Sequence, residues 1–249
     1  MPRHDATPRP PRFLTALPVY NEASHVAGVL DEVLRFTPDV LVVDDGSADG
    51  TSDVLTRRQD IHVVRHPINR GYGAALTTAF AEALAGDWDG LVTIDCDGQH
   101  QPQLIPEFIR RASDETQPAD IVSGSRYLQP PPPGVSVPAD RRQINHNVTA
   151  ELNQRLGFTL TDAFCGFKAY TRRSLECLRI QEPGYAMPLE VWVQAAAAGL
   201  RVVELPVPLI YLDENRSFGG SLDDAATRLE YYRCVLDQAE AAMAANKPE

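Results

Sequence analysis

The chain has 249 residues, which allows one large domain or at most two small ones. Hydrophobic residues make up 43% and charged residues 23%, an ordinary profile for a soluble globular protein. The formal net charge of −11 argues against a sequence-independent grip on phosphates, so nucleic acid is not expected as a partner. An acidic protein that binds an anionic nucleotide needs a metal ion or locally placed arginines.

The cysteines and the ends of the chain predict a cytoplasmic location. The four cysteines lie far apart without a C-x-x-C pair, which predicts free thiols in a reducing compartment. No apolar run approaches the roughly 18 residues of a membrane span. Residues 1–12 are rich in Pro and Arg and predict a disordered tail rather than a signal peptide. We expect the folded domain at 13–240 and a second tail at 241–249.

Strand and helix patterns alternate through the first half of the chain. Short apolar runs predict strands at 13–17, 40–43, 61–64, 90–92 and 120–123. Apolar residues at helical spacing, together with small-residue segments, predict helices at 23–36, 48–59, 71–84 and 104–109. This alternation predicts an α/β fold with a mostly parallel sheet covered by helices.

The second half is less regular. Four consecutive prolines at 130–133 predict a stiff, extended loop. Apolar patterns predict helices at 144–156, 189–198 and 221–245, and a strand at 167–170. A strand at 202–207 should lie at an edge of the sheet, because Pro206 cannot donate to a ladder. The last helix carries one apolar stripe, which predicts that it docks on the domain.

The most informative stretch is Thr93–His100, directly after an apolar run. Asp95 and Asp97 are two residues apart, so on a strand both carboxylates point to one face, and Gln99 continues that face with an amide oxygen. Oxygen ligands at the end of a strand suit Mg²⁺ or Mn²⁺, and such a cation can bind a diphosphate. The stretch therefore indicates chemistry on a nucleotide-linked substrate, although a lone D-x-D pair is equally well explained as a solvated turn.

Polar clusters follow three successive strands, at 18–22, 44–47 and 95–100. Ligands of open α/β sheets bind outside the carboxyl ends of the strands, so three such clusters favour one binding site over separate turns. We expect one of Asp44 and Asp45 to cap the next helix and the other to face the ligand. The position of Tyr20 past its strand favours a stacking surface for a base over a core aromatic.

The segment Asn69–Gly73 is rich in glycine but incomplete as a nucleotide motif. It lacks the third glycine of a dinucleotide fingerprint, and the chain has no P-loop. A glycine-rich helix start and a nucleotide contact explain it equally well, and Arg70 either reaches a phosphate or lies in solvent. His66 and His100 are weaker metal candidates because Mg²⁺ prefers oxygen ligands, and a helix-start role competes for His100.

Several arginines and one aspartate are candidates for binding an acceptor. The arginines could together hold a phosphate in an acidic protein, although each alone is explained by surface charge; they are Arg126, Arg141, Arg142 and Arg216. Asp162 precedes a glycine turn, where a carboxylate is often structural. It could also act as a general base or orient an acceptor.

The order of these motifs resembles that of family 2 glycosyltransferases, and within them the dolichol- and polyprenol-phosphate mannose or glucose synthases. The similarity covers roughly residues 13–235 and rests on 17–22, 43–47, 95–100, 124–126 and Asp162-x-x-x-Gly166-Phe167. It implies a single GT-A domain with a Rossmann-like sheet. It also implies inverting, metal-dependent transfer of mannose or glucose from a GDP- or UDP-linked sugar to a polyprenyl phosphate.

The resemblance also assigns roles on the donor side. The residues that would line the base and ribose are Pro18, Tyr20, Glu22 and Asp45. Asp95 would contact the nucleoside and the metal region, and Asp97 and Gln99 would ligate Mg²⁺ or Mn²⁺. Arg70 joins this set as a candidate substrate contact.

On the acceptor side the resemblance points to arginines. Arg126 and one of Arg141 and Arg142 would hold the acceptor phosphate, and Arg142 is the one we select. Arg216 would lie on a flexible loop that closes over the diphosphate. The expected catalytic residues are therefore Asp97, Arg126 and Asp162.

The chain departs from this family pattern in several places. Leu222 stands where relatives carry a basic residue, and Ala79-Phe80 where many have glycine. The Q-x-x-R-W motif of processive polysaccharide synthases does not occur, which disfavours a polymerase. C-terminal membrane helices are not expected, so a lipid acceptor would require peripheral membrane contact or a membrane partner.

Three other functions compete with this one. The same donor could serve a soluble hydroxyl acceptor, in which case a carboxylate such as Asp162 would have to act as base; an acceptor phosphate, already anionic, needs none. A nucleotide-sugar-binding protein without turnover is the second. A nucleotidyltransferase is the third, and it is disfavoured because residues 18–22 do not form a loop rich in Gly and Arg or Lys.

Overall fold

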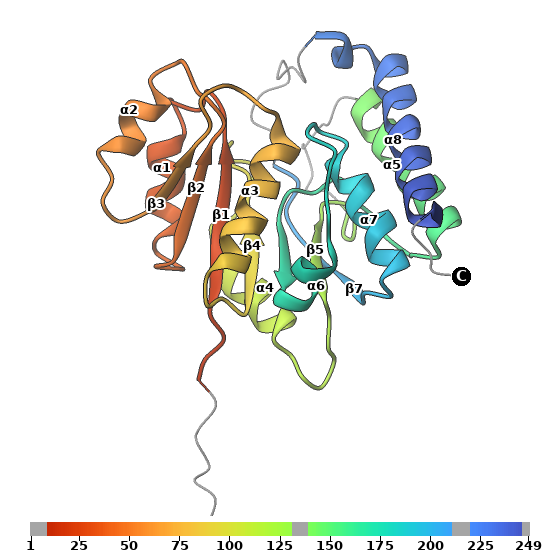
Figure 1. Cartoon of the computed structure of the whole chain (residues 1–249), viewed down its shortest axis with the longest axis horizontal. Coiled ribbons are helices and arrows are strands. Elements are labelled where there is room, and N and C mark those ends of the chain that lie inside the picture. Colours follow the sequence, from red (N-terminus) through yellow and green to blue (C-terminus); the bar gives the residue numbers. More distant parts are fainter. Residues whose placement is uncertain (1–8, 131–138, 211–219, 246–249) are drawn as a thin grey trace, which may run out of the picture.

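The computed structural model describes residues 9–130, 139–210 and 220–245. The first half alternates strands and helices in the order β1 (Phe13–Val19), α1 (Val26–Val33), β2 (Val40–Asp44), α2 (Thr51–Thr56), β3 (His62–Arg65), α3 (Tyr72–Ala85), β4 (Gly90–Thr93), η1 (Pro102–Leu104), α4 (Ile105–Ala112) and β5 (Ile121–Ser125). The second half contains α5 (Ala139–Leu156), β6 (Lys168–Thr171), α6 (Arg172–Cys177), α7 (Met187–Ala197), β7 (Val202–Pro206), η2 (Gly220–Asp223) and α8 (Ala225–Ala245) (Figure 1).

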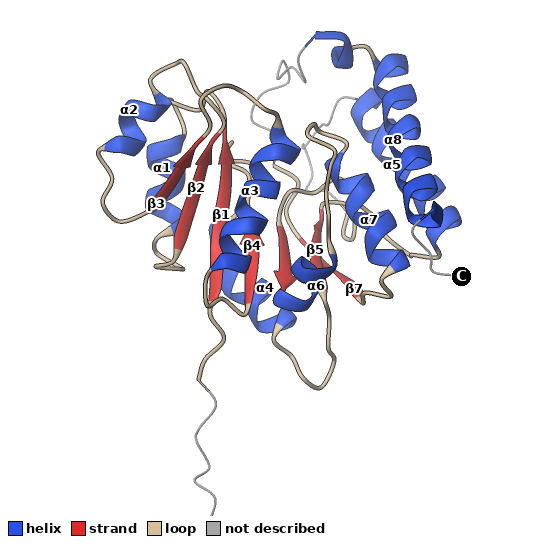
Figure 2. Cartoon of the chain, viewed as in Figure 1, coloured by secondary structure: helices blue, strands red, loops and turns tan. Residues whose placement is uncertain are grey.

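The described strands form one seven-stranded sheet in the order β3-β2-β1-β4-β6-β5-β7. Every neighbouring pair is parallel except those of β6, which runs antiparallel to both β4 and β5. The expected α/β architecture with a mostly parallel sheet is confirmed, and Figure 2 shows the helices on both sides of it. Continuous apolar strands fit this arrangement because both faces of such a sheet are covered.

Two hydrophobic cores lie on opposite faces of the sheet. In β1, Leu14 and Ala16 face the core formed with α3 and α7, whereas Phe13 and Leu17 face the core formed with α1 and α4. This split follows from the alternation of side chains along a strand. The two long helices α5 and α8 pack against each other and against α7, which forms a further layer on the first face.

Several element boundaries differ from the sequence-based expectation. The helix expected at 48–59 begins only at Thr51, because Asp49 accepts hydrogen bonds from the Thr51 amide and hydroxyl and Gly50 adopts φ +97°. Helix α6 was not predicted, since six residues leave no helical periodicity to read; the Thr171 hydroxyl caps it by accepting from Ser174 N. Helix α8 ends at Ala245, as expected for the helix at 221–245, but it begins only at Ala225, after the short η2.

The ends and the cysteines can be compared with expectation only in part. Residues 1–8 of the expected tail lie outside the described residues, and Arg12 N donates to the Asp89 carboxylate at 2.8 Å. All four cysteines lie in the described part of the chain, and no disulfide joins any two of them. Across residues 9–130, 139–210 and 220–245, no helix has both the length and the apolarity required to cross a membrane.

Candidate active site

A pocket of about 910 Å³ opens at the carboxyl ends of β1, β2 and β4 and extends to α5 and α8. After β1 the chain forms β2 and β3 on one side of it and then crosses to form β4 on the other side. The pocket therefore lies where the strand order reverses. Eight of the residues predicted from sequence line it: Pro18, Tyr20, Glu22, Asp45, Asp95, Asp97, Gln99 and Arg126. The structure thus gathers the three strand-end clusters into one site.

Asp95 is held in place by neighbours on both sides. Its carboxylate accepts hydrogen bonds from the Tyr72 hydroxyl at 2.9 Å and pairs with His100 Nε2 at 3.2 Å. A Cβ at Gly166 would come within 2.1 Å of Asp95 Oδ2, so only glycine leaves room for this carboxylate. Burial and then the charge of Asp95 raise the pKa of Tyr72, so the hydroxyl stays protonated as the donor.

Asp97 and Gln99 lie against each other in a tight turn. Asp97 accepts from the Gln99 backbone N at 3.0 Å and from Gln99 Nε2 at 2.8 Å. Among the described residues no three His, Cys, Asp or Glu side chains converge to hold a metal ion by themselves. Mg²⁺ is commonly held by one or two carboxylates together with substrate phosphates. Asp95, Asp97 and Gln99 therefore fit a divalent ion that binds together with a diphosphate.

Asp44 and Asp45, at the end of β2, make different contacts. Asp44 is buried and accepts from Ser47 N and the Ser52 hydroxyl, at the turn into α2. Asp45 lines the pocket and accepts from Arg70 N at 2.9 Å and Gly71 N at 2.7 Å, and its Oδ1 lies 2.6 Å from His66 Nδ1. Asp45 therefore organises the loop 66–71 as well as facing the pocket.

The end of β1 is joined to the end of β2 by hydrogen bonds between backbone amides and side chains. Asn21 adopts φ +55°, and its amide oxygen accepts from Ala48 N while its own N donates to the Ser47 hydroxyl. Tyr20, which is 45% exposed, is left at the pocket wall, where it can stack on a flat ligand. Glu22 is nearly buried and contacts His25.

The glycines of the 69–73 segment serve packing. A Cβ at Gly71 would lie 2.3 Å from the Pro183 carbonyl oxygen, and one at Gly73 would lie 2.2 Å from the Glu182 carbonyl oxygen. The glycine-rich start of α3 therefore lets the 182–184 loop approach. Arg70 is exposed and does not line the pocket.

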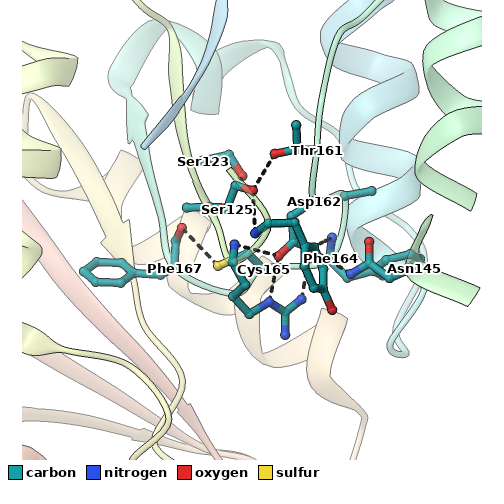
Figure 3. A network of polar contacts seen from close by, with 12 residues as sticks. Ser123, Ser125, Asn145, Thr161, Asp162, Phe164, Cys165 and Phe167 are labelled. Carbon is teal, nitrogen blue, oxygen red and sulfur yellow. Dashed lines mark hydrogen bonds and ion pairs between the residues drawn. The ribbon is translucent and has the colours of Figure 1, made fainter. Parts of the chain in front are cut away.

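Arg126 and Asp162 form a two-point ion pair at the other side of the pocket. Figure 3 shows Asp162 together with Asn145 and Phe164 in this network of polar contacts. Arg126 Nε lies 2.7 Å from Asp162 Oδ2, and Nη2 lies 2.9 Å from Oδ1. Asp162 is completely buried, and its carboxylate also accepts from Asn145 Nδ2 and Phe164 N. The Arg126 side chain is 28% exposed, and Arg126 lines the pocket. Asp162 itself lies behind Arg126.

The Asp162 carboxylate is poorly suited to accept a proton. Burial raises its pKa, but the Arg126 charge and the hydrogen bonds outweigh burial, so the pKa lies well below its usual range. A general base works best with a pKa near the operating pH. The geometry suits Asp162 to fixing Arg126. The turn before it is fastened by Glu204, which accepts from Thr161 N and Asp162 N.

The two adjacent arginines on α5 differ in position. Arg141 is half-buried and lines the pocket, whereas Arg142 is exposed and does not. The sequence analysis selected Arg142, which is the solvent-exposed residue of the two. Side chains of adjacent residues on a helix point in directions about 100° apart, so only one of the two faces the pocket. Arg216 lies outside the described residues, as do residues 131–138 of the proline-rich loop.

Arg228 and Tyr185 are among the pocket residues that the sequence analysis did not identify. Arg228 of α8 is buried, lines the pocket, contacts Asp140 at 3.1 Å and donates to the Leu222 carbonyl. Arg228 lies three residues after Ala225 and four before Tyr232, so it falls on the apolar stripe of α8. A charged residue on that stripe was the sequence signal that could have identified it. Tyr185 precedes α7 in a segment with no motif, and no comparable signal marked it.

The sequence comparisons identify the family. The model described as Glycosyl transferase family 2 matches residues 15–179, and the chain belongs to this family. It is 32% identical over 232 residues to an undecaprenyl-phosphate mannosyltransferase of Micrococcus luteus, covering 88% of this chain and 92% of that protein. It is 33% identical over 216 residues to a polyprenol monophosphomannose synthase of Mycolicibacterium smegmatis, covering 81% of this chain and 79% of that protein.

Solved structures with this arrangement confirm the GT-A fold. A glucosyl-3-phosphoglycerate synthase of Mycobacterium tuberculosis in complex with Mn²⁺ and UDP-glucose superposes with a TM-score of 0.70 at 21% identity, covering 92% of this chain and 79% of that one. The same enzyme with phosphoglyceric acid gives a TM-score of 0.71 at 20% identity, covering 92% and 80%. The protein is thus a glycosyltransferase of family 2, similar to these two mannosyltransferases.

Proposed function

We propose that this protein transfers a hexose, mannose or glucose, from a nucleoside-diphosphate sugar to a polyprenyl phosphate, with inversion at the anomeric carbon. The observation that carries the acceptor class is the Arg126 guanidinium, held at the pocket wall by the buried Asp162 carboxylate. The two mannosyltransferase relatives support the same acceptor, since their names specify undecaprenyl phosphate and polyprenol.

The donor nucleotide would lie over the carboxyl ends of β1, β2 and β4. Tyr20 would stack on the base, and Pro18, Glu22 and Asp45 would line the base and ribose. Asp45 already accepts from the 70 and 71 amides and contacts His66, so its contact with the nucleotide would use its remaining acceptor capacity. The choice between GDP and UDP is one that the transfer assay below resolves.

The diphosphate would lie next to Asp95, Asp97 and Gln99. Asp97 and Gln99 would ligate Mn²⁺ or Mg²⁺, with Asp95 beside them fixed by Tyr72 and His100. A divalent ion bound there would neutralise the charge that develops on the leaving diphosphate.

The acceptor would lie against the arginines and the apolar wall of the pocket. Arg126 and Arg141 would hold its phosphate, with Arg228 adding positive charge at the same wall. The side chains beside them are apolar and fit an isoprenoid chain: Ile144, Phe164, Pro188, Leu209, Ile210 and Tyr232. A lipid acceptor requires contact with a membrane surface, which we place at the mouth of this pocket.

The reaction would be one displacement. The bond between the anomeric carbon and the diphosphate oxygen breaks, and its electron pair leaves with the nucleoside diphosphate. An oxygen of the acceptor phosphate attacks from the opposite face and forms the new bond. The acceptor oxygen is anionic at neutral pH, so the reaction does not call on the low-pKa Asp162 carboxylate for a proton.

A transfer assay tests this proposal against the alternatives. GDP-mannose, UDP-glucose and UDP-N-acetylglucosamine, each radiolabelled in the sugar, are incubated with Mn²⁺ and either polyprenyl phosphate or the matching polyprenol. The proposal expects label in the lipid phase with GDP-mannose or UDP-glucose, and only with the phosphorylated lipid; transfer from UDP-N-acetylglucosamine would contradict the proposed sugar. Transfer to polyprenol, or to a soluble hydroxyl compound in place of the lipid, would contradict it. Binding of a donor without any turnover would instead support a nucleotide-sugar-binding protein.

A further inference from the structure

We propose that Tyr185, stacked on Tyr72, is the platform on which the hexose ring of the donor lies, and that it is a specificity-determining residue of this site. The inference rests on the proposed function, since it names the subsite of the sugar that is transferred. The argument comes from three features: the exposed ring, the loop that fixes it, and its link to the donor carboxylates.

Tyr185 presents an aromatic ring to the pocket. It is 40% exposed, one of the few large apolar side chains that are exposed among the described residues, and it lines the pocket. Its ring centroid lies 5.7 Å from that of Tyr72, with the planes 21° apart. Aromatic faces inside ligand pockets provide apolar contact area, and a tyrosine adds a hydroxyl that can bond a polar ligand.

Hydrogen bonds to two glutamates, Glu190 and Glu182, fix the loop that carries Tyr185. Glu190 in the first turn of α7 is nearly buried and accepts from Gln181 N and Glu182 N, each at 2.8 Å. Glu182 in turn accepts from Gly184 N at 2.7 Å and from the Tyr231 hydroxyl of α8. The nearly buried Glu190 and the half-buried Glu182 therefore hold the backbone on both sides of Pro183, and this fixes the loop that presents Tyr185 to the pocket.

The loop is also fixed from the side of α3. Ala74 N donates to the Pro183 carbonyl at 3.1 Å, and Gly71 and Gly73 leave no space for a Cβ between α3 and this loop. The close approach brings Tyr72, which lies between the two glycines, under the ring of Tyr185. The two glycines thus fix the position of the Tyr185 loop relative to α3.

Tyr72 connects the platform to the donor side of the pocket. Its hydroxyl donates to Asp95 Oδ1 at 2.9 Å, beside the residues proposed to hold the metal and the diphosphate. Arg126, proposed to hold the acceptor phosphate, lines the same pocket. The transferred sugar must lie between the diphosphate and the acceptor phosphate. The Tyr72–Tyr185 pair, joined to the donor carboxylates, offers a C–H face of the pyranose an aromatic surface there.

Binding measurements that compare a nucleoside diphosphate with its sugar conjugate test this platform. Calorimetry in the presence of Mn²⁺ gives the dissociation constants of UDP, UDP-glucose, GDP and GDP-mannose for the wild type, Tyr185→Ala and Tyr185→Phe. Ile68→Ala serves as the control, because Ile68 is 69% exposed and does not line the pocket. Thermal unfolding of each variant confirms that it folds.

We expect Tyr185→Ala to bind the nucleoside diphosphate as the wild type does and its sugar conjugate about five- to tenfold more weakly. Tyr185→Phe, which keeps the ring, and Ile68→Ala should bind both as the wild type does. Unchanged binding of the conjugate by Tyr185→Ala, or equal weakening of both ligands, would overturn the platform and leave the proposed function standing. A wild-type protein that binds none of the four ligands would contradict the proposed function itself.

Discussion

Arg126 and Asp162 meet through two parallel contacts, with Nε 2.7 Å from Oδ2 and Nη2 2.9 Å from Oδ1, yet only the arginine reaches the pocket. The carboxylate is fully buried and also accepts hydrogen bonds from Asn145 Nδ2 and Phe164 N. Loss of activity on replacing Asp162 would therefore not identify a general base, because the same change would release Arg126.

Asp162→Asn should destabilise the fold. The substitution removes one partner of a buried, hydrogen-bonded ion pair, which typically costs about 3–5 kcal/mol. We expect a loss at the lower end of that range in the free energy of unfolding, since Asn keeps some of the hydrogen bonds. Urea unfolding followed by circular dichroism measures it. Asp87→Asn is the matched control: its side chain is 89% exposed, so its change should stay within about 0.5 kcal/mol.

The same ion pair predicts a pH dependence. The pKa of Asp162 is lowered in the folded state, so its contribution is complete above the unfolded pKa of about 3.9 and is lost as pH falls through the lower folded pKa. Stability of the wild type should therefore fall on acidification below about pH 4 more steeply than that of Asp162→Asn. Parallel curves for the two proteins would show that Asp162 carries no such stabilisation. In activity, the acid limb of the pH–rate profile should not shift in a residually active Asp162→Asn.

Arg141 and Arg142 provide an internal comparison for acceptor binding. Arg141 lines the pocket and Arg142 points to solvent, although they are adjacent on α5. Arg141→Ala should raise KM for polyprenyl phosphate about tenfold, as expected for a lost charge-assisted hydrogen bond, and leave KM for the donor unchanged. Arg142→Ala should change neither constant. Equal effects of the two substitutions would argue that surface charge, and not a phosphate contact, is responsible.

Gly73 and Gly28 should respond to alanine in opposite directions. A Cβ at Gly73 would lie 2.2 Å from the Glu182 carbonyl oxygen, whereas nothing lies within 4 Å of a Cβ at Gly28. Gly73→Ala should destabilise the protein by about 1–3 kcal/mol through overpacking. Gly28→Ala in helix α1 should stabilise it by up to about 1 kcal/mol. Thermal unfolding of the two variants beside the wild type measures both, and a tolerated Gly73→Ala would contradict the packing role.

Much of the part of the pocket proposed to bind the donor was predictable from the sequence. Short apolar strands that end in polar clusters place Pro18–Glu22, Asp45 and Asp95–Gln99 at one edge of a parallel sheet, because the carboxyl ends of parallel strands coincide. The expectation that one of Asp44 and Asp45 caps the next helix is wrong, because Gly50 is the N-cap of α2 and no side chain caps it. Asp44 instead accepts from Ser47 N in the preceding turn, whereas Asp45 lines the pocket. The local sequence pattern is enough to predict a residue's place in the pocket where that place is determined by a strand and the turn after it.

The part of the pocket proposed to bind the acceptor, and the loop that carries Tyr185, depend on packing between distant segments, which sequence periodicity does not report. The rotation of α5 decides whether Arg141 or Arg142 faces the pocket, and it is set by the packing of α5 against α7 and α8. The contact of Gly71 and Gly73 with the 182–184 loop joins segments more than a hundred residues apart. Tyr185 and Arg228 became visible only once these segments were placed together.

The most direct test of this account is metal-dependent donor binding by the wild type and by Asp97→Asn, measured by thermal shift. GDP, UDP and their sugar conjugates are each added with Mn²⁺, with Mg²⁺ or with a chelator. A ligand at about one hundred times its dissociation constant should add roughly 2.7 kcal/mol to the stability of the wild type. We predict such a shift for one nucleotide class with metal, little shift with chelator, and loss of the metal dependence in Asp97→Asn. A folded wild-type protein that shifts with none of these ligands would contradict the assignment of this pocket as a nucleoside-diphosphate-sugar site.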